Sequence, residues 1–245
     1  MTITIFDDLA AEEELLETVL SGLPEQAWRS ASSADGWTVA DVVLHLTQTE
    51  EAVLAAVAGD TPLPDWRPRT GGVDQVMDAM VRADRATPAE VFQRWRTARR
   101  LALTALRQAE PQHPVPWVAS SLKPRTLATT RLAEHWAHAL DITGPLGIDY
   151  PDSRRLRHVA WLGHSTLPYA FALAGQQPHD LYCELTAPDD TVWRYGPPDA
   201  DSSITGPAGA FCRVGARRLA PEESGLVAHG PHGLAALRVL RNYAG

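Results

Sequence analysis

The chain has 245 residues, of which 44% are hydrophobic and 21% are charged, and its formal net charge is −8. A chain of this size accommodates one large domain or two small ones. The acidic balance and the single lysine, Lys123, argue against a nucleic-acid partner, because phosphate binding needs clustered lysine and arginine side chains.

No segment of the sequence has the pattern of a signal peptide or a membrane span. The N-terminus lacks a basic segment followed by a long apolar core, and no apolar run approaches the length that crosses a bilayer. Two cysteines, Cys183 and Cys212, are too few for a disulfide framework, and each is interpreted as a small buried hydrophobic residue. We therefore expect a cytoplasmic protein without a membrane partner, either a monomer or a homodimer.

Apolar residues at helical spacing, together with capping signals, predict four long helices in the first part of the chain. These helices cover residues 7–21, a segment from Thr38, a segment from Thr87 and residues 127–143. Thr38 with Asp41 resembles a capping box, and Thr87 with Glu90 completes another. The four helices are expected to form a bundle.

Proline and glycine residues interrupt the helical pattern at two places. They predict a loop over residues 59–72, which we expect to shape an entrance, and a short helix over residues 73–84 follows it. An amphipathic helix is predicted over residues 153–174, with a kink at Pro168. We assign this helix to the same domain as the bundle.

The pattern changes after residue 175 from helical spacing to short alternating segments. Strands are predicted over residues 181–186, 191–195 and 226–229, and helices over residues 208–218 and 234–243. The predicted fold is therefore mostly α. It consists of a four-helix bundle over residues 1–175 and a small α+β domain over residues 176–245.

Glu134 and His138 are four residues apart in the fourth predicted helix, a spacing that puts both side chains on one face. His45 belongs to the second predicted helix, and two helices of a bundle can bring three such side chains to one point. Two imidazoles and one carboxylate, with coordination positions left over, are typical of a reactive metal site. We therefore predict that His45, Glu134 and His138 hold a metal ion.

Two further residues on this helix are candidate catalytic groups. Asp141 follows His138 by three residues, and it is expected to orient the imidazole as a hydrogen-bond acceptor or to bind substrate. Arg131 lies one turn before Glu134, and it is expected to pair with Glu134 or to contact an anionic substrate group. His135 points roughly 100° away from Glu134 and is not expected to share a metal with it.

The same residues also allow a purely structural interpretation. A glutamate and a histidine four residues apart occur often on exposed helix faces, where they stabilise the helix only weakly. A salt bridge with Arg131 would satisfy a buried Glu134 as well as a metal would. His45 taken alone fits a histidine at the edge of the core. The residues alone leave both interpretations open.

Two spaced segments, residues 36–46 and 134–141, carry a family resemblance. They read Gly-Trp-Thr-Val-x-Asp-x-x-x-His-Leu and Glu-x-Trp-x-His-x-x-Asp. This pair resembles the DinB-like metal-binding proteins and, more narrowly, the actinobacterial group related to mycothiol-dependent maleylpyruvate isomerase. Residues 156–163, 168–172 and 204–212 are similar to one branch of that group, so the resemblance extends over nearly the whole chain.

The resemblance implies a DinB-like bundle and a small C-terminal domain that helps to close the site. It also implies a divalent metal, usually zinc, on His45, Glu134 and His138, and mycothiol as cofactor or co-substrate in some relatives. If the thiol is used, Arg217 and Arg218 at the end of a predicted helix are candidates for binding carboxylates of mycothiol or of the substrate.

Three functions follow, in order of preference. The first is a metal-dependent transferase or isomerase that uses mycothiol on a small electrophilic substrate, because a metal-bound thiol ionises at neutral pH and attacks an activated carbon. The second is a metalloenzyme without a thiol, such as a hydrolase, lyase or cyclase. The third is a non-catalytic metal-binding protein, which three visible ligands with open positions disfavour.

Overall fold

The structure is a computed structural model that describes residues 3–60, 72–118 and 120–243. The entrance loop predicted over residues 59–72 lies almost entirely outside these described residues. Within them, the chain forms two compact units, of which the first ends at Tyr150 and the second begins at Pro151.

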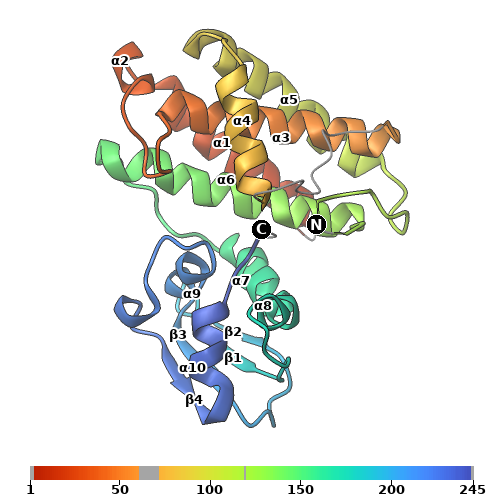
Figure 1. Ribbon diagram of the computed structural model, residues 1–245, viewed down its shortest axis with the longest axis vertical. Helices are drawn as coiled ribbons and strands as arrows, with labels where there is room; N and C mark the ends of the chain where they lie inside the picture. Colours follow the sequence, from red (N-terminus) through yellow and green to blue (C-terminus); the bar gives the residue numbers. More distant parts are fainter. Residues whose placement is uncertain (1–2, 61–71, 119, 244–245) are drawn as a thin grey trace. The chain divides into compact units, whose positions relative to one another are not determined.

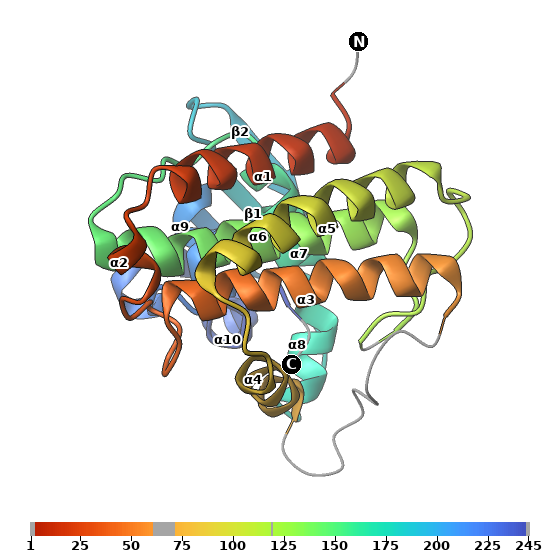
Figure 2. The same ribbon diagram turned by 90° about the horizontal axis from the view of Figure 1, so that it is seen from above.

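Six helices make up the described part of the first unit (Figure 1). They are α1 (Ile5–Ser21), α2 (Glu25–Trp28), α3 (Val39–Ala58), α4 (Gly72–Ala83), α5 (Pro88–Gln108) and α6 (Pro124–Leu146). In the bundle, α3 packs on α5, α5 on α1, α1 on α6 and α6 on α3. Figure 2 shows these four helices from the side and α4 nearly end-on, so α4 crosses the bundle where it packs on α3. The predicted mostly α fold with a four-helix bundle is confirmed.

Local hydrogen bonds explain where the bundle helices begin. Thr38 donates its backbone N–H to Asp41 Oδ2 over 2.8 Å, while the Asp41 N–H donates to Thr38 Oγ1. Thr87 and Glu90 form the same reciprocal arrangement at the start of α5. Each box satisfies two backbone donors that a helix start leaves unpaired, so both predicted capping boxes are present.

Large apolar side chains fill the interior of the bundle. Trp95 from α5 and Trp136 from α6 are 0% and 2% exposed, and leucines from all four bundle helices are buried around them. Complete burial of one such side chain contributes about 1.5–3 kcal/mol, so this packing supplies most of the driving force for assembly. Charged and imidazole side chains lie in the same interior, which the apolar pattern alone does not predict.

The second unit combines helices with a small sheet. Its elements are α7 (Leu156–Ser165), α8 (Leu167–Leu173), β1 (Tyr182–Thr186), β2 (Val192–Tyr195), β3 (Ser203–Pro207), α9 (Ala208–Gly215), the 3₁₀ turn η1 (Pro221–Glu223), β4 (Val227–His229) and α10 (Gly230–Val239). The strand order is β2-β1-β3-β4, with β1 and β3 parallel and both outer pairs antiparallel. This is a small α+β fold.

Two details of the second unit correct the sequence-based prediction. The segment predicted as one helix is divided at Thr166 into α7 and α8, and both pack within the second unit, α7 on α9 and α8 on α10. The units therefore divide after residue 150 rather than after residue 175. Strand β3 was not predicted, because its parallel pairing with β1 is set by tertiary contact and leaves no local signal.

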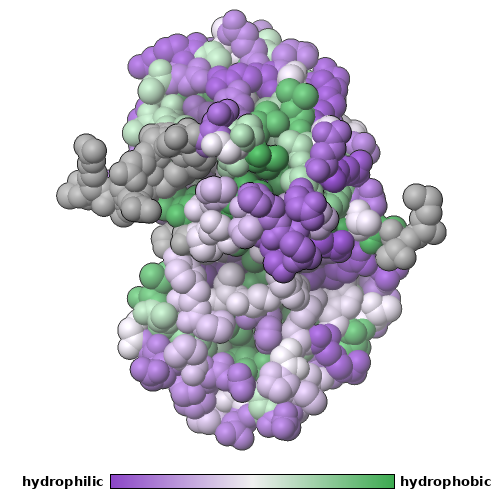
Figure 3. All heavy atoms as spheres, turned by 90° about the vertical axis from the view of Figure 1, so that its right-hand side faces the viewer, coloured by the Kyte–Doolittle hydropathy of each residue, from purple (hydrophilic) through white to green (hydrophobic). Residues whose placement is uncertain are grey.

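The surface agrees with the polar composition. Hydrophilic residues cover most of the face shown in Figure 3, and apolar residues form limited patches on it. None of the helices in the described ranges combines the length and the apolar character that crossing a bilayer requires.

We expect Gly209→Ala to destabilise the second unit. A Cβ atom at Gly209 would lie 1.8 Å from Oδ2 of Asp152, whose carboxylate accepts two hydrogen bonds from Arg213 at 2.7 and 2.8 Å. Displacing this pair should lower the free energy of unfolding by about 1–3 kcal/mol, the usual cost of overpacking. Chemical denaturation followed by circular dichroism measures the change.

Gly22→Ala is the matched control. Its added Cβ would lie 3.5 Å from the nearest atom, and the backbone at Gly22 already has a φ of −86°. If Gly209→Ala lowers the free energy of unfolding no more than Gly22→Ala does, the packing argument is contradicted.

Candidate metal centre

The structure brings the three predicted ligands together at the contact between α3 and α6. His45 Nε2 lies 3.7 Å and His138 Nε2 lies 3.4 Å from the same oxygen, Glu134 Oε2. One donor atom from each residue lies within 4.8 Å of the other two. Two ligands at 2.0–2.2 Å from a tetrahedral ion are about 3.3–3.6 Å apart, so these separations suit a single zinc-sized ion.

The arrangement of α3 and α6 explains why the three side chains converge and which of them is most exposed. Glu134 and His138 share one face of the continuous helix α6, and the His45 ring on α3 lies 4.9 Å from the His138 ring. The side chains of His45 and His138 are 10% and 12% exposed, whereas that of Glu134 is 29% exposed. The carboxylate side of the cluster is therefore the side most exposed to solvent.

Asp141 fixes the orientation of one imidazole. His138 Nδ1 lies 2.9 Å from Asp141 Oδ2, and Asp141 is 2% exposed. A proton on Nδ1 donated to this carboxylate leaves the Nε2 lone pair directed at the cluster. The Asp141 carbonyl also accepts the backbone N–H of Ser33 at 2.9 Å, which ties the loop before α3 to α6. Of the two roles considered for Asp141, this geometry fits the orienting one.

Trp37 packs against the other imidazole. Its ring centroid lies 5.3 Å from that of His45, and its indole N–H donates to Asp78 Oδ1 on α4 at 2.9 Å. Asp78 Oδ2 accepts a second hydrogen bond from Arg82 Nε at 2.7 Å. Helix α4 thus holds the indole in place beside the cluster. Trp37 belongs to the family segment over residues 36–46, but the sequence did not indicate what this residue does.

Burial and hydrogen bonding set the protonation of the three groups. Burial lowers the pKa of His45, which favours the neutral imidazole that a metal binds. Burial opposes ionisation of Glu134. When the imidazoles of His138 and His45 are protonated at the nitrogens that face Glu134, their hydrogen bonds to the carboxylate outweigh burial and hold the Glu134 pKa well below its ordinary value. Burial lowers the pKa of His138, but hydrogen bonds to Asp141 and Glu134 outweigh burial, so the pKa of His138 is raised.

Arg131 does not form the predicted ion pair with Glu134. Its Nε donates to Glu50 Oε1 at 2.7 Å and its Nη2 donates to Thr49 Oγ1 at 2.7 Å, both on α3. The residue is only 2% exposed, so its guanidinium is enclosed in the bundle and is not presented to a substrate. The position of Arg131 therefore fits a structural charge better than a substrate contact.

A second group of possible ligands lies deeper in the bundle. Donor atoms of Glu13, Glu50 and His135 are within 4.8 Å of one another, and all three residues are buried. His135 Nδ1 lies 2.9 Å from the Arg131 carbonyl, and its Nε2 accepts the Trp95 indole N–H at 3.2 Å. Both ring nitrogens are thus engaged, and burial lowers the His135 pKa to about 3. With arginines nearby as counter-charges, this group fits a buried polar network rather than a metal site.

Glu13 is the unsatisfied member of this network. Neither of its carboxylate oxygens has a hydrogen-bond partner among the residues that the structure describes, although Arg99 Nη1 lies 3.5 Å from Oε2. Arg99 instead forms its close contact with Glu17. Burial, and then the charge of Glu50, raise the pKa of Glu13 well above its ordinary value. The protonated carboxyl is therefore the form that the folded state favours.

The sequence contained a signal for both buried glutamates. Glu13 follows Leu9 by four residues, and Glu50 follows Leu46 by four, so each falls on the apolar stripe of its helix. A charged residue in such a stripe must be paired in the interior.

The remaining predicted residues lie in the second unit. Arg217 and Arg218 are exposed and follow α9, which ends at Gly215 rather than at residue 218, and Arg217 has a φ of +61°. Cys183 and Cys212 are buried, as predicted. Burial raises the pKa of Cys183 to about 12 and that of Cys212 well above its ordinary value, so both thiols stay protonated at neutral pH.

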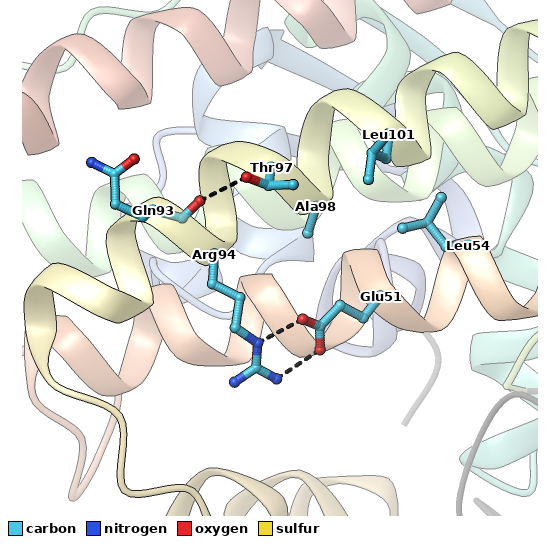
Figure 4. Close-up of a pocket in the computed structure, with 7 residues that line it drawn as sticks. All are labelled: Glu51, Leu54, Gln93, Arg94, Thr97, Ala98 and Leu101. Atoms are coloured by element: carbon cyan, nitrogen blue, oxygen red, sulfur yellow. Dashed lines mark hydrogen bonds and ion pairs between the residues drawn. The ribbon is translucent and has the colours of Figure 1, made fainter.

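A hollow of about 460 Å³ lies between α3 and α5 (Figure 4). Glu51 and Arg94 form an ion pair across it, and Leu54 and Leu101 line its apolar end. None of the predicted ligands lines this hollow. The hollow is therefore separate from the predicted metal ligands.

Comparison with known proteins identifies the family. Residues 9–143 match the family described as the mycothiol maleylpyruvate isomerase N-terminal domain. The chain belongs to this family. The matched region contains His45, Glu134 and His138, together with Arg131 and Asp141, whereas the second unit lies outside it.

Relatives and solved structures extend the likeness to nearly the full chain. An uncharacterised protein of Mycobacterium tuberculosis, matched in two strains, is 32% identical over 217 residues, which are 87% of this chain and 84% of the relative. Two crystal structures of mycothiol-dependent maleylpyruvate isomerase, one with a histidine-to-alanine substitution, are 16% and 13% identical. Their TM-scores are 0.61 and 0.62, with 95% of this chain and 99% of theirs covered. At this identity the likeness shows a shared fold.

We expect His138→Ala to abolish zinc binding and Asp141→Asn to weaken it. Loss of an orienting carboxylate usually lowers metal affinity about 10–100-fold. Zinc affinity measured by competition with a chelator checks both variants, and Asp149→Asn, an exposed carboxylate of the same unit, is the control. Unchanged zinc binding in His138→Ala would rule out this ligand set.

We expect Glu13→Gln to stabilise the protein increasingly as the pH rises. The folded state binds the Glu13 proton more tightly than the unfolded state, whose pKa is near the ordinary 4.5, so wild-type stability falls from that pH up to the raised pKa. An amide does not titrate and so removes this loss, which amounts to about 1.4 kcal/mol for each unit by which folding raises the pKa. Urea denaturation at pH 5 and pH 8 measures the difference.

Glu14→Gln is the matched control, because Glu14 is exposed on the same helix. Equal pH dependence in the two variants would show that Glu13 is not the titrating group.

Proposed function

We propose that the protein is a mycothiol-using isomerase or transferase that acts on a small electrophilic substrate and depends on a divalent metal, zinc. The main support is the convergence of His45, Glu134 and His138, open on its carboxylate side, in a member of the mycothiol maleylpyruvate isomerase family. The solved structures that share its fold are described as a mycothiol-dependent maleylpyruvate isomerase.

The donor set fits the metal. Two neutral imidazoles and one carboxylate suit zinc, and three protein ligands leave at least one coordination position for a small molecule. A divalent metal bound there would lower the pKa of a coordinated thiol so that it ionises at neutral pH. Zinc is preferred over harder cations because imidazole is a poor ligand for magnesium and calcium.

The thiol must come from a small molecule. Cys183 and Cys212 are buried in the second unit, and burial raises the pKa of both thiols, so neither serves as a nucleophile at neutral pH. Mycothiol, the thiol in the family's description, fills this role.

Other residues are assigned to positioning and binding. Asp141 holds the His138 ring in the tautomer that directs Nε2 at the metal. Trp37 offers an apolar surface beside His45, against which a substrate can pack away from water. Arg217 and Arg218, both exposed, are the candidates for binding carboxylates of mycothiol or of the substrate.

The test uses the full-length protein in zinc-loaded and chelator-treated forms. We expect one zinc ion per chain by elemental analysis, and a rise in melting temperature with added mycothiol in the zinc-loaded form alone. Maleylpyruvate and a panel of small electrophiles are then assayed for mycothiol-dependent turnover. Removing the metal should abolish turnover, because the thiol then keeps its ordinary pKa.

The variants separate metal binding from thiol binding. Glu134→Ala should lose zinc, whereas Arg217→Ala and Arg218→Ala should keep zinc and respond several-fold less to mycothiol; Arg194→Ala, an exposed arginine of the same unit, is the control. Zinc without any response to mycothiol would overturn the thiol assignment in favour of a metalloenzyme that activates water. Failure to bind zinc would overturn the proposal as a whole.

A further inference from the structure

Arg131 is placed where it would be expected to compete with the metal. It precedes Glu134 by three residues on α6, and oppositely charged side chains at this spacing usually pair across one helix turn. An arginine bound to the Glu134 carboxylate would occupy its lone pairs and cancel its charge. Both effects would weaken metal binding, because a divalent cation needs that same carboxylate.

Helix α3 holds the guanidinium in another direction. Glu50 accepts from Arg131 Nε and Thr49 accepts from Arg131 Nη2, each at 2.7 Å, and all three residues are at most 5% exposed. The Thr49 hydroxyl donates its own proton to the His45 carbonyl at 3.0 Å, so its lone pairs remain for Arg131. The two acceptors, Thr49 and Glu50, therefore lie about one helix turn after His45 on α3.

Charge balance favours the same arrangement. A buried guanidinium needs a carboxylate, and Glu50 supplies one at the cost of enclosing a second charge. Glu134 then faces the two imidazoles instead, with His138 Nε2 at 3.4 Å. The net positive charge of Arg131 is also neutralised locally, which lowers its repulsion of a cation at the cluster.

We propose that Glu50 and Thr49 are positioning residues that hold Arg131 away from Glu134 and so keep this carboxylate free for the metal. The inference rests on the proposed metal role of His45, Glu134 and His138. Glu50 touches neither metal nor substrate in this arrangement. It acts through Arg131, and its effect should therefore disappear when Arg131 carries no charge.

Zinc affinity by chelator competition, in the absence of mycothiol, tests this inference. We expect Glu50→Gln to bind zinc at least 10-fold more weakly than the wild type, the lower end of the usual effect of groups that support a metal ligand. The double variant Glu50→Gln/Arg131→Met, which removes both charges, should recover affinity to within about threefold of the wild type. If Glu50→Gln weakened zinc binding only by loosening the bundle, the double variant would bind zinc more weakly still, because it carries a second change in the core.

Threonine variants provide a test that leaves every charge in place. Thr49→Val removes one acceptor of Arg131 and should weaken zinc binding several-fold, less than Glu50→Gln does. Thr47→Val is the matched control, because Thr47 is equally buried on α3 but its hydroxyl bonds only the Val43 carbonyl among the described residues. Melting temperatures of all variants without metal confirm that each one is folded.

The outcomes separate this inference from the proposed function. Zinc binding by the wild type with unchanged affinity in Glu50→Gln would overturn the role of Glu50 and leave the metal centre standing. A double variant that binds no better than Glu50→Gln would also overturn it. A wild type that binds no zinc would overturn the proposed metal function, and this inference with it.

Discussion

The buried ion pair between Arg131 on α6 and Glu50 on α3 constrains the whole candidate site. A guanidinium inside a bundle is unfavourable unless its donors are satisfied, so α3 and α6 must meet in the register that brings Glu50 to it. That register also sets His45 opposite Glu134. The packing that satisfies a structural charge is therefore also the packing that brings the predicted metal ligands together, and a shift of α3 along α6 by one turn would disrupt both.

Sequence patterns predict those features of the molecule that depend on residues close together along the chain. The capping box at Thr38 and the helical spacing of Glu134 and His138 are local, and both are present in the structure. The partner of Arg131 could not be predicted in the same way, because Glu134 was the nearest carboxylate in sequence while Glu50 is the nearest one in space. Parallel pairing of β3 with β1 and the division of the chain after Tyr150 likewise depend on tertiary contacts.

The two imidazoles of the candidate site are supported differently. His138 has a carboxylate behind it, whereas the buried His45 Nδ1 has no hydrogen-bond partner among the described residues and its ring rests against Trp37. A histidine ligand normally donates this second ring N–H, and the donation strengthens its bond to a metal. The cluster therefore has a firmly held side on α6 and a more weakly supported side on α3, where the His45 imidazole lies beside an indole that Asp78 holds by a hydrogen bond.

Burial of both cysteine side chains also determines how the folded protein withstands reactive small molecules. Alkylation and mixed-disulfide formation require an exposed thiolate, and Cys183 and Cys212 are enclosed and held in the protonated form. Electrophiles and oxidised thiols that reach the folded protein therefore meet no exposed cysteine thiol among the described residues. A catalyst that handled such compounds would be protected from inactivation through its own cysteines.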